Sequence, residues 1–136
     1  MKVCVIGAGA IGGWIAGLLA EAGNDVSLLA RGETLAALKA NGLKIRRKGD
    51  ERIHRLRVSN DPAELGAQDA VIIAVKGQAV PAIAAAVKSL CGPNTIVVPA
   101  INGIPWWFFQ VEGVLQSGFA LTSVDPSGET SRTIAP

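Results

Sequence analysis

The chain has 136 residues, enough for one domain with a real core, and 49% of them are hydrophobic. The mean hydropathy of +0.37 suggests a membrane protein, but glycines interrupt the apolar run after Met1-Lys2, and no apolar stretch reaches the roughly 18 residues of a spanning helix. The net charge of +2 is close to neutral. The two cysteines and the one histidine are not spaced as metal ligands are. We therefore expect a cytoplasmic protein with no metal and no membrane partner.

The first predicted element is a strand, Lys2–Ile6, and a G-x-G-x-x-G turn follows it directly. The turn is Gly7-Ala8-Gly9-Ala10-Ile11-Gly12. In dinucleotide-binding folds the first glycine permits the tight turn, the second lets a pyrophosphate approach the backbone, and the third lets the next helix pack closely. The amides and the positive end of the helix dipole then face the phosphates. We predict that all six residues bind a dinucleotide cofactor.

A helix over residues 10–22 is expected next, because large apolar side chains recur at helical spacing. We expect these side chains to form its buried face: Ile11, Trp14, Ile15, Leu18 and Leu19. Gly23 suits the cap that ends the helix. A second strand over residues 26–30 and a short helix over residues 34–40 follow.

The end of the second strand distinguishes between two cofactors. An NAD site places Asp or Glu there to bind the ribose 2′-hydroxyl, but this chain has Ala30-Arg31-Gly32. A guanidinium matches a phosphate through bidentate, charge-assisted hydrogen bonds. Arg31 therefore favours NADP (NADPH) over NAD, although a solvated arginine after a strand is the alternative.

Seven of the thirteen basic residues lie between Lys44 and Arg57. A nucleic-acid patch is one interpretation. Apolar residues alternate with the charges, however, and residues 48–51 resemble a turn, so a solvated two-stranded basic ribbon over residues 43–58 is favoured. We expect no nucleic-acid partner.

The remaining elements continue an alternation of helices and apolar strands. Asp61-Pro62 begins a short helix, residues 70–75 and 95–98 form strands, and residues 80–90 form a helix between them. This alternation predicts an α/β fold: a Rossmann-like, doubly wound, mainly parallel sheet with the ribbon inserted.

Two polar residues follow predicted strands at the edge where such sheets bind ligands. Lys76 comes directly after the strand at 70–75, and Asn102 follows the later strand. Each is a candidate for binding cofactor or substrate. The alternatives are a strand end in water for Lys76 and a turn chosen for its backbone angles at Asn102-Gly103.

Four of the six aromatic residues are consecutive: Trp106, Trp107, Phe108 and Phe109. They form either a core-facing helix or a docking face for a further domain or a second subunit in a homodimer. We expect residues 1–110 to form the NADP-binding domain. Residues 111–136 are expected to be an irregular tail, without a terminal helix or strand, at the start of a truncated remainder.

The chain resembles the ketopantoate reductases (2-dehydropantoate 2-reductases). The resemblance rests on residues 7–13, Leu29-Ala30-Arg31-Gly32, 41–43, Ser59-Asn60-Asp61-Pro62, Val75-Lys76 and the segment from Asn102 to Trp107, in this order. It implies an NADPH-binding domain of an enzyme that reduces a 2-oxo acid, 2-dehydropantoate, to pantoate, a step toward pantothenate.

Carried over by position, the resemblance implies that Gly7, Gly9 and Gly12 hold the pyrophosphate and that Arg31 holds the 2′-phosphate. Lys76 and Asn102 would line the crevice for cofactor and substrate. It also implies that the catalytic general-acid lysine belongs to a helical C-terminal domain with no counterpart in these 136 residues. We therefore expect no catalytic residue and little or no turnover here. A non-catalytic NADP-binding module and a domain of another NADP-dependent 2-oxo or 3-hydroxy acid dehydrogenase are the alternatives.

Overall fold

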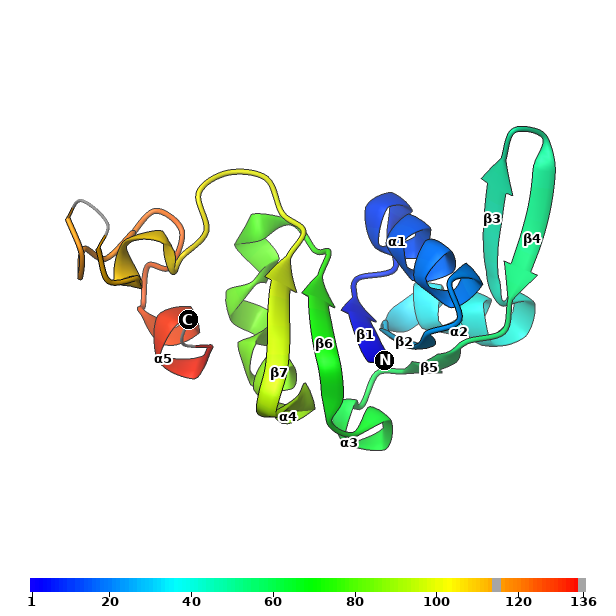
Figure 1. Ribbon diagram of the computed structural model, residues 1–136, viewed down its shortest axis with the longest axis horizontal. Helices are drawn as coiled ribbons and strands as arrows, with labels where there is room; N and C mark the ends of the chain where they lie inside the picture. Colours follow the sequence, from blue (N-terminus) through cyan, green and yellow to red (C-terminus); the bar gives the residue numbers. More distant parts are fainter. Residues whose placement is uncertain (114–115, 135–136) are drawn as a thin grey trace.

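The computed structural model describes residues 1–113 and 116–134. Five parallel strands form the main sheet, in the order β5-β2-β1-β6-β7 (Figure 1). Their bounds are Lys2–Ile6 (β1), Asp25–Leu29 (β2), Arg57–Ser59 (β5), Gln68–Ile73 (β6) and Cys91–Pro99 (β7). The chain winds from β1 toward β5 and then returns to wind toward β7, so the predicted doubly wound sheet is confirmed. The switch point, where such folds bind ligands, lies between β1 and β6.

Two apolar clusters cover the two faces of the sheet. Alternate residues of β1 belong to different clusters, as the pleat of a strand requires. Cys4 and Ile6 pack with Val87 and Leu90 of α4 (Ala84–Leu90), whereas Val5 packs with the side of α1 (Ala10–Glu21). Burial raises the pKa of the Cys4 thiol, which fits a structural rather than a reactive cysteine.

The predicted buried face of α1 is wrong in part: Leu19 packs against the core, but two of the other predicted residues do not. Ile11 is 63% exposed and Trp14 is 38% exposed. The buried residues are small: Gly12, Gly13, Ala16 and Gly17. A Cβ on Gly13 would lie 3.3 Å from Leu43 Cδ1, and one on Gly17 would collide with Ile45. The helix therefore packs with its backbone close to β3, and Ile11 and Trp14 face away from the core.

The basic ribbon is present as an antiparallel hairpin of β3 (Leu43–Arg47) and β4 (Asp50–His54). It ends earlier than predicted, because Arg57 and Val58 pair with β2 in the main sheet. Glu51 forms ion pairs with Lys44 at 2.9 Å and Arg46 at 3.1 Å, and hydrogen bonds from these two side chains lower the pKa of its carboxyl. Part of the basic charge is thus neutralised within the hairpin.

Among the other helices that follow strands, the one after β5 is short and α4 starts irregularly. After β2 comes α2 (Gly32–Asn41), and α3 (Pro62–Leu65) follows β5, with the Asp61 side chain accepting a hydrogen bond from the Ala63 amide at 2.9 Å. The helix predicted over 80–90 begins as two 3₁₀ turns, Gly77–Ala79 and Pro81–Ile83, before α4. Pro81 lacks an N–H and cannot continue an α-helical ladder.

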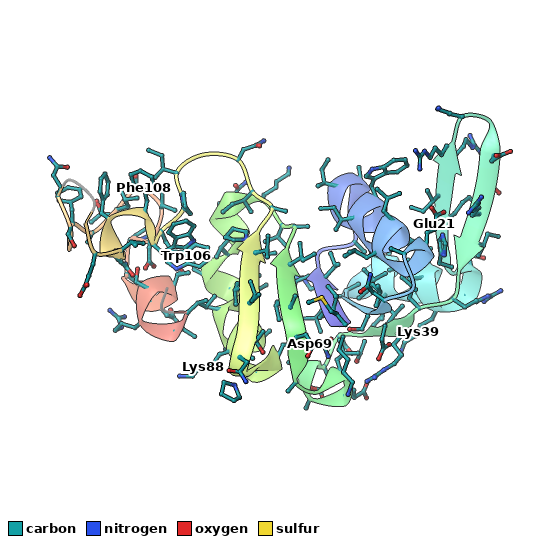
Figure 2. The ribbon with its side chains drawn as sticks, in the orientation of Figure 1. Glu21, Lys39, Asp69, Lys88, Trp106 and Phe108 are labelled. Atoms are coloured by element: carbon teal, nitrogen blue, oxygen red, sulfur yellow. The ribbon has the colours of Figure 1, made fainter. Side chains whose placement is uncertain are left out.

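Trp106 belongs to the core. It is 2% exposed, and its indole Nε1 donates a hydrogen bond to the Ile134 carbonyl at 3.1 Å. Figure 2 shows it between β7 and the C-terminal helix α5 (Glu129–Thr133), with Phe108 farther from the sheet. Trp106 therefore cannot contribute to an external docking face, whereas Phe108 is 42% exposed.

Residues after 110 are less irregular than expected, because α5 follows a folded turn. Asp125 accepts hydrogen bonds from the amides of Thr130 and Ser131 and from the Ser131 hydroxyl. Burial acts to raise the pKa of Asp125, but these hydrogen bonds outweigh it and lower the pKa. The expectation of no terminal helix is thus wrong for residues 129–133, and Ala135-Pro136 lie outside the described residues. No helix in the described ranges is long and apolar enough to cross a membrane.

Candidate functional site

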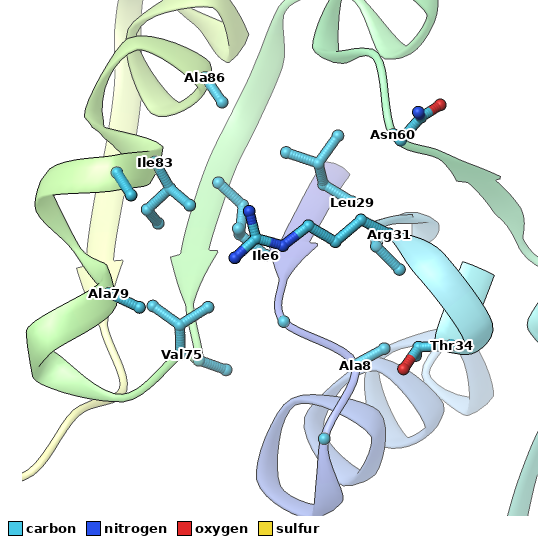
Figure 3. A pocket seen from close by; sticks show the side chains of 15 residues that line it. Ile6, Ala8, Leu29, Arg31, Thr34, Asn60, Val75, Ala79, Ile83 and Ala86 are labelled. Atoms are coloured by element: carbon cyan, nitrogen blue, oxygen red, sulfur yellow. The ribbon is translucent and has the colours of Figure 1, made fainter.

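A cleft of about 460 Å³ opens at the carboxyl ends of β1, β2 and β6 (Figure 3). The glycine turn after β1 and the end of β2 form one side, and the segment that leads from β6 into α4 forms the other. Four of the predicted cofactor residues line it: Gly7, Ala8, Gly9 and Arg31. Ala10, Ile11 and Gly12 begin α1 and do not line it.

Two glycines of the turn are fixed by the protein's own packing. Gly7 has φ +96°, and a Cβ there would lie 2.8 Å from the Ala74 carbonyl oxygen and from Val75 Cγ1. A Cβ on Gly12 would collide with the Gly7 carbonyl oxygen. The Gly7 amide also donates to the Leu29 carbonyl at 3.2 Å. These contacts bind the turn to β2 and β6 and set where α1 begins.

Gly9 differs from both. It lines the cleft with φ −74°, an angle that any residue adopts, and no atom would lie within 4 Å of a Cβ built on it. Folding therefore does not require glycine at this position. The open space beside its backbone, at the N-terminus of a 12-residue helix, fits the close approach of a phosphate to free amides.

Arg31 stands at the other end of the cleft, where β2 gives way to α2. It is the exposed N-cap residue of α2, and its side chain extends into the cleft (Figure 3). Among the residues that line the cleft, none is Asp or Glu. The cleft thus offers a cation, and no carboxylate, at the end of β2.

Sequence reasoning missed Thr34 and Asn60, which also line the cleft. Thr34 lies in the first turn of α2, whose amides have no acceptor within the helix. Asn60 directly follows β5. The signal that singled out Lys76, a polar residue after a strand, could have found Asn60 as well.

The opposite wall is apolar and was also missed. Small and branched side chains from the 3₁₀ turns and α4 form it: Ala79, Ala82, Ile83 and Ala86. Together with Ile6 and Leu29 they make a surface suited to a flat, apolar ring. Alanines spaced three or four residues apart on a helix are typical of a helix face packed in the core. The sequence therefore did not distinguish this wall of the cleft from ordinary core packing.

Lys76 and Asn102 lie outside this cleft. β6 ends at Ile73 and β7 at Pro99, so each residue is the third after its strand rather than directly at its end. Both are exposed, on loops at the carboxyl edge of the sheet. The structure thus places them at the predicted edge, but neither lines the cleft of the glycine turn.

The switch-point cleft, the glycine turn and the strand order together define a Rossmann-like domain, a fold class in which dinucleotides bind at the switch point. Comparison with known proteins identifies the family. The family model "Ketopantoate reductase PanE/ApbA" matches residues 3–125, and the chain belongs to this family of oxidoreductases.

Two curated relatives align with nearly all of the chain. The 2-dehydropantoate 2-reductase of Mesorhizobium japonicum (strain LMG 29417 / CECT 9101 / MAFF 303099) is 42% identical over 137 residues, which cover 100% of this chain. The uncharacterized oxidoreductase YkpB of Bacillus subtilis (strain 168) is 34% identical over 142 residues, which cover 99% of it. The chain spans less than half of these relatives, 42% and 46% of their lengths.

Solved structures agree with this assignment. A candidate ketopantoate reductase from Ralstonia solanacearum MolK2 matches 98% of the chain with a TM-score of 0.92 and 45% identity, over 41% of its own length. A D-mandelate dehydrogenase, solved with NADH and anilino(oxo)acetate, matches 76% of the chain with a TM-score of 0.71 and 28% identity, over 34% of its own length.

Proposed function

We propose that the chain is the NADPH-binding domain of a 2-oxo acid reductase of the 2-dehydropantoate 2-reductase type. The observation that carries the proposal is the presence of Arg31, rather than a carboxylate, in the same cleft as the glycine turn. Membership of the ketopantoate reductase family supports the reaction class.

The residues of the cleft suit different parts of NADPH. The amides of the glycine turn and the N-terminus of α1 would hold the pyrophosphate, since the space beside Gly9 is open. Arg31, with Thr34 beside it, would hold the 2′-phosphate. The wall that includes Ile83 would cover the adenine. NADPH, when bound, supplies the hydride, and the protein supplies binding and orientation.

Lys76 and Asn102 remain proposed contacts to the nicotinamide end or the substrate, because both lie at the carboxyl edge of the sheet. The general-acid lysine that the resemblance implies is not assigned to either. The 136-residue chain is therefore expected to bind the cofactor without measurable reduction of ketopantoate. A homodimer that uses Trp107, Phe108 and Phe109 stays a prediction, without the buried Trp106.

A titration with NADPH and NADH tests the cofactor proposal. We expect NADPH to bind more tightly, and Arg31→Ala to weaken NADPH by about 10- to 100-fold while leaving NADH unchanged, because a hydrogen bond to a charged group contributes about 1.5–3 kcal/mol. Arg47→Ala, which removes an exposed arginine of the hairpin, is the matched control. Equal affinities for both cofactors, or an NADPH preference that survives Arg31→Ala, would refute the proposal.

A second candidate is a reductase or dehydrogenase that acts on a different 2-oxo or 2-hydroxy acid. The similarity to a D-mandelate dehydrogenase solved with NADH favours it. The same titration bears on it, since a preference for NADH would favour this candidate over the ketopantoate type. A non-catalytic NADP-binding module is the third candidate.

A further inference from the structure

The turn that follows β5 is held in place by its own side chains. Its residues are Ser59-Asn60-Asp61-Pro62. Ser59 is buried, its hydroxyl accepts a hydrogen bond from the Asp61 amide at 3.0 Å, and its carbonyl accepts one from the Ala30 amide at 2.9 Å. Asp61 caps α3, and Pro62 is the first residue of that helix. Three of the four residues therefore have a structural role.

Asn60 has no such role. Its φ is not in the left-handed region, where asparagine is favoured over most residues, so the turn does not require asparagine for its backbone angles. It is exposed, and within the described residues its side-chain amide makes no hydrogen bond. Its neighbours on both sides are fixed, however, so its backbone position is fixed as well. A polar side chain at a defined position, without a partner in the protein, is suited to bind a ligand.

Asn60 lines the switch-point cleft. Figure 3 shows it across the cleft from Ile83 of the apolar wall. In the described residues, three side chains in the lining carry polar atoms: Arg31, Thr34 and Asn60. Arg31 and Thr34 belong to the start of α2 and are proposed to hold the 2′-phosphate. Asn60 comes from a different element and is left without a proposed contact.

An adenine ring in this cleft requires two kinds of contact. Its flat faces fit the apolar wall around Ile83. Its edge carries the 6-amino group, which donates a hydrogen bond, next to N7, which accepts one. The side-chain amide of asparagine offers an acceptor and a donor, and it pairs with this edge through two hydrogen bonds. Arg31 only donates, so it cannot form the same pair.

We propose that Asn60 determines the base specificity of the cleft. Its side-chain oxygen accepts a hydrogen bond from the 6-amino group of adenine, and its side-chain nitrogen donates one to N7. This inference rests on the proposed function, because it requires a dinucleotide in the cleft. The turn after β5 then selects the base, whereas Arg31 at the start of α2 selects the 2′-phosphate. The two selectivities lie on different elements and can be changed separately.

The test is a titration of the 136-residue chain with NADPH and with its hypoxanthine analogue, in which an oxygen replaces the 6-amino group. This oxygen accepts hydrogen bonds and cannot donate to Asn60, so we expect NADPH to bind about tenfold more tightly. Asn60→Ala should weaken NADPH by about tenfold and the analogue by no more than about twofold, so that the preference disappears. Asn94→Ala, which removes an exposed asparagine away from the cleft, is the matched control and should keep the preference.

Three results would overturn the proposal. Equal affinity of the unchanged chain for NADPH and the analogue would show that the 6-amino group is not recognised. A preference that survives Asn60→Ala would assign the recognition to another residue. An equal loss of affinity for both ligands in Asn60→Ala would place Asn60 against a part of the cofactor that they share. NADPH still binds the unchanged chain in all three cases, whereas a chain that binds no NADPH contradicts the proposed function itself and this inference with it.

Discussion

The two ends of the switch-point cleft differ in how tightly the surrounding structure constrains them. At the glycine turn the backbone is locked, because Gly7 and Gly12 have no room for a side chain. At the end of β2, Arg31 is an exposed side chain on the first turn of a helix that has no buried residues. The shape of the proposed phosphate site is therefore tied to the fold, whereas the proposed selectivity for NADPH rests on a residue that can change without disturbing the core.

The largest expected effect comes from Gly12→Ala, which changes the locked end. The added methyl group collides with the Gly7 carbonyl, and Ala74 Cβ lies 2.9 Å away, so the backbone must move. We expect a loss of about 3 kcal/mol or more in the free energy of unfolding, and a fall of about 10 °C in the thermal midpoint. Calorimetry or circular dichroism measures both.

Gly92→Ala is the matched control for this substitution. A Cβ at Gly92 would lie 3.8 Å from Ala67 Cβ and from Thr95 Oγ1, which is ordinary contact. Its thermal midpoint should stay near that of the unchanged chain. If Gly12→Ala were equally stable, the turn would be adaptable and the contrast between the two ends of the cleft would not hold.

A smaller and more selective effect is expected from Gly9→Ala. The methyl group meets no protein atom within 4 Å, and the backbone angles suit alanine. The cost in stability is at most about 1 kcal/mol, because alanine is a poorer N-cap residue than glycine. We expect binding of NADPH and NADH to weaken by at least about tenfold, since the methyl group fills space proposed for the pyrophosphate.

Isothermal titration measures the affinity of each Gly9 and Gly12 variant for both cofactors, and a thermal scan measures the stability of the same variants. Gly12→Ala should lose both properties, and Gly9→Ala only binding. Unchanged affinity in Gly9→Ala would place the pyrophosphate elsewhere and remove the reason for this comparison.

The doubly wound sheet and four of its strands could be predicted from the sequence, because each of these strands contains a short apolar run between turn residues. The three-residue edge strand β5, which carries Arg57, could not, since its sequence continues the basic ribbon. The packing of α1 could not be predicted either. Periodicity marks large apolar residues, yet Gly13 and Gly17 face β3 because the backbones approach too closely for side chains. The closest contacts of α1 are therefore made by glycines, which hydrophobic periodicity does not detect.

The site shows the same division. The glycine turn and Arg31 could be predicted, because their chemistry is local to a few consecutive residues. The apolar wall around Ile83 could not, since it faces the turn only after β6 pairs with β1. The burial of Trp106 likewise depends on Ile134, 28 residues away, and no local pattern reports such a contact.

The smallest expected effect is at Thr34, which lies in the first turn of α2, the helix that Arg31 caps. Thr34→Ala removes one neutral hydroxyl from the exposed first turn of α2, so stability should change by less than about 0.5 kcal/mol. If the hydroxyl donates to the 2′-phosphate, NADPH binding weakens by about fivefold, which corresponds to about 1 kcal/mol, and NADH binding does not change. Thr34→Ser keeps the hydroxyl and should retain the NADPH affinity. An equal loss for both cofactors would instead place Thr34 against a part of the molecule that they share, and Arg31 would then carry the discrimination alone.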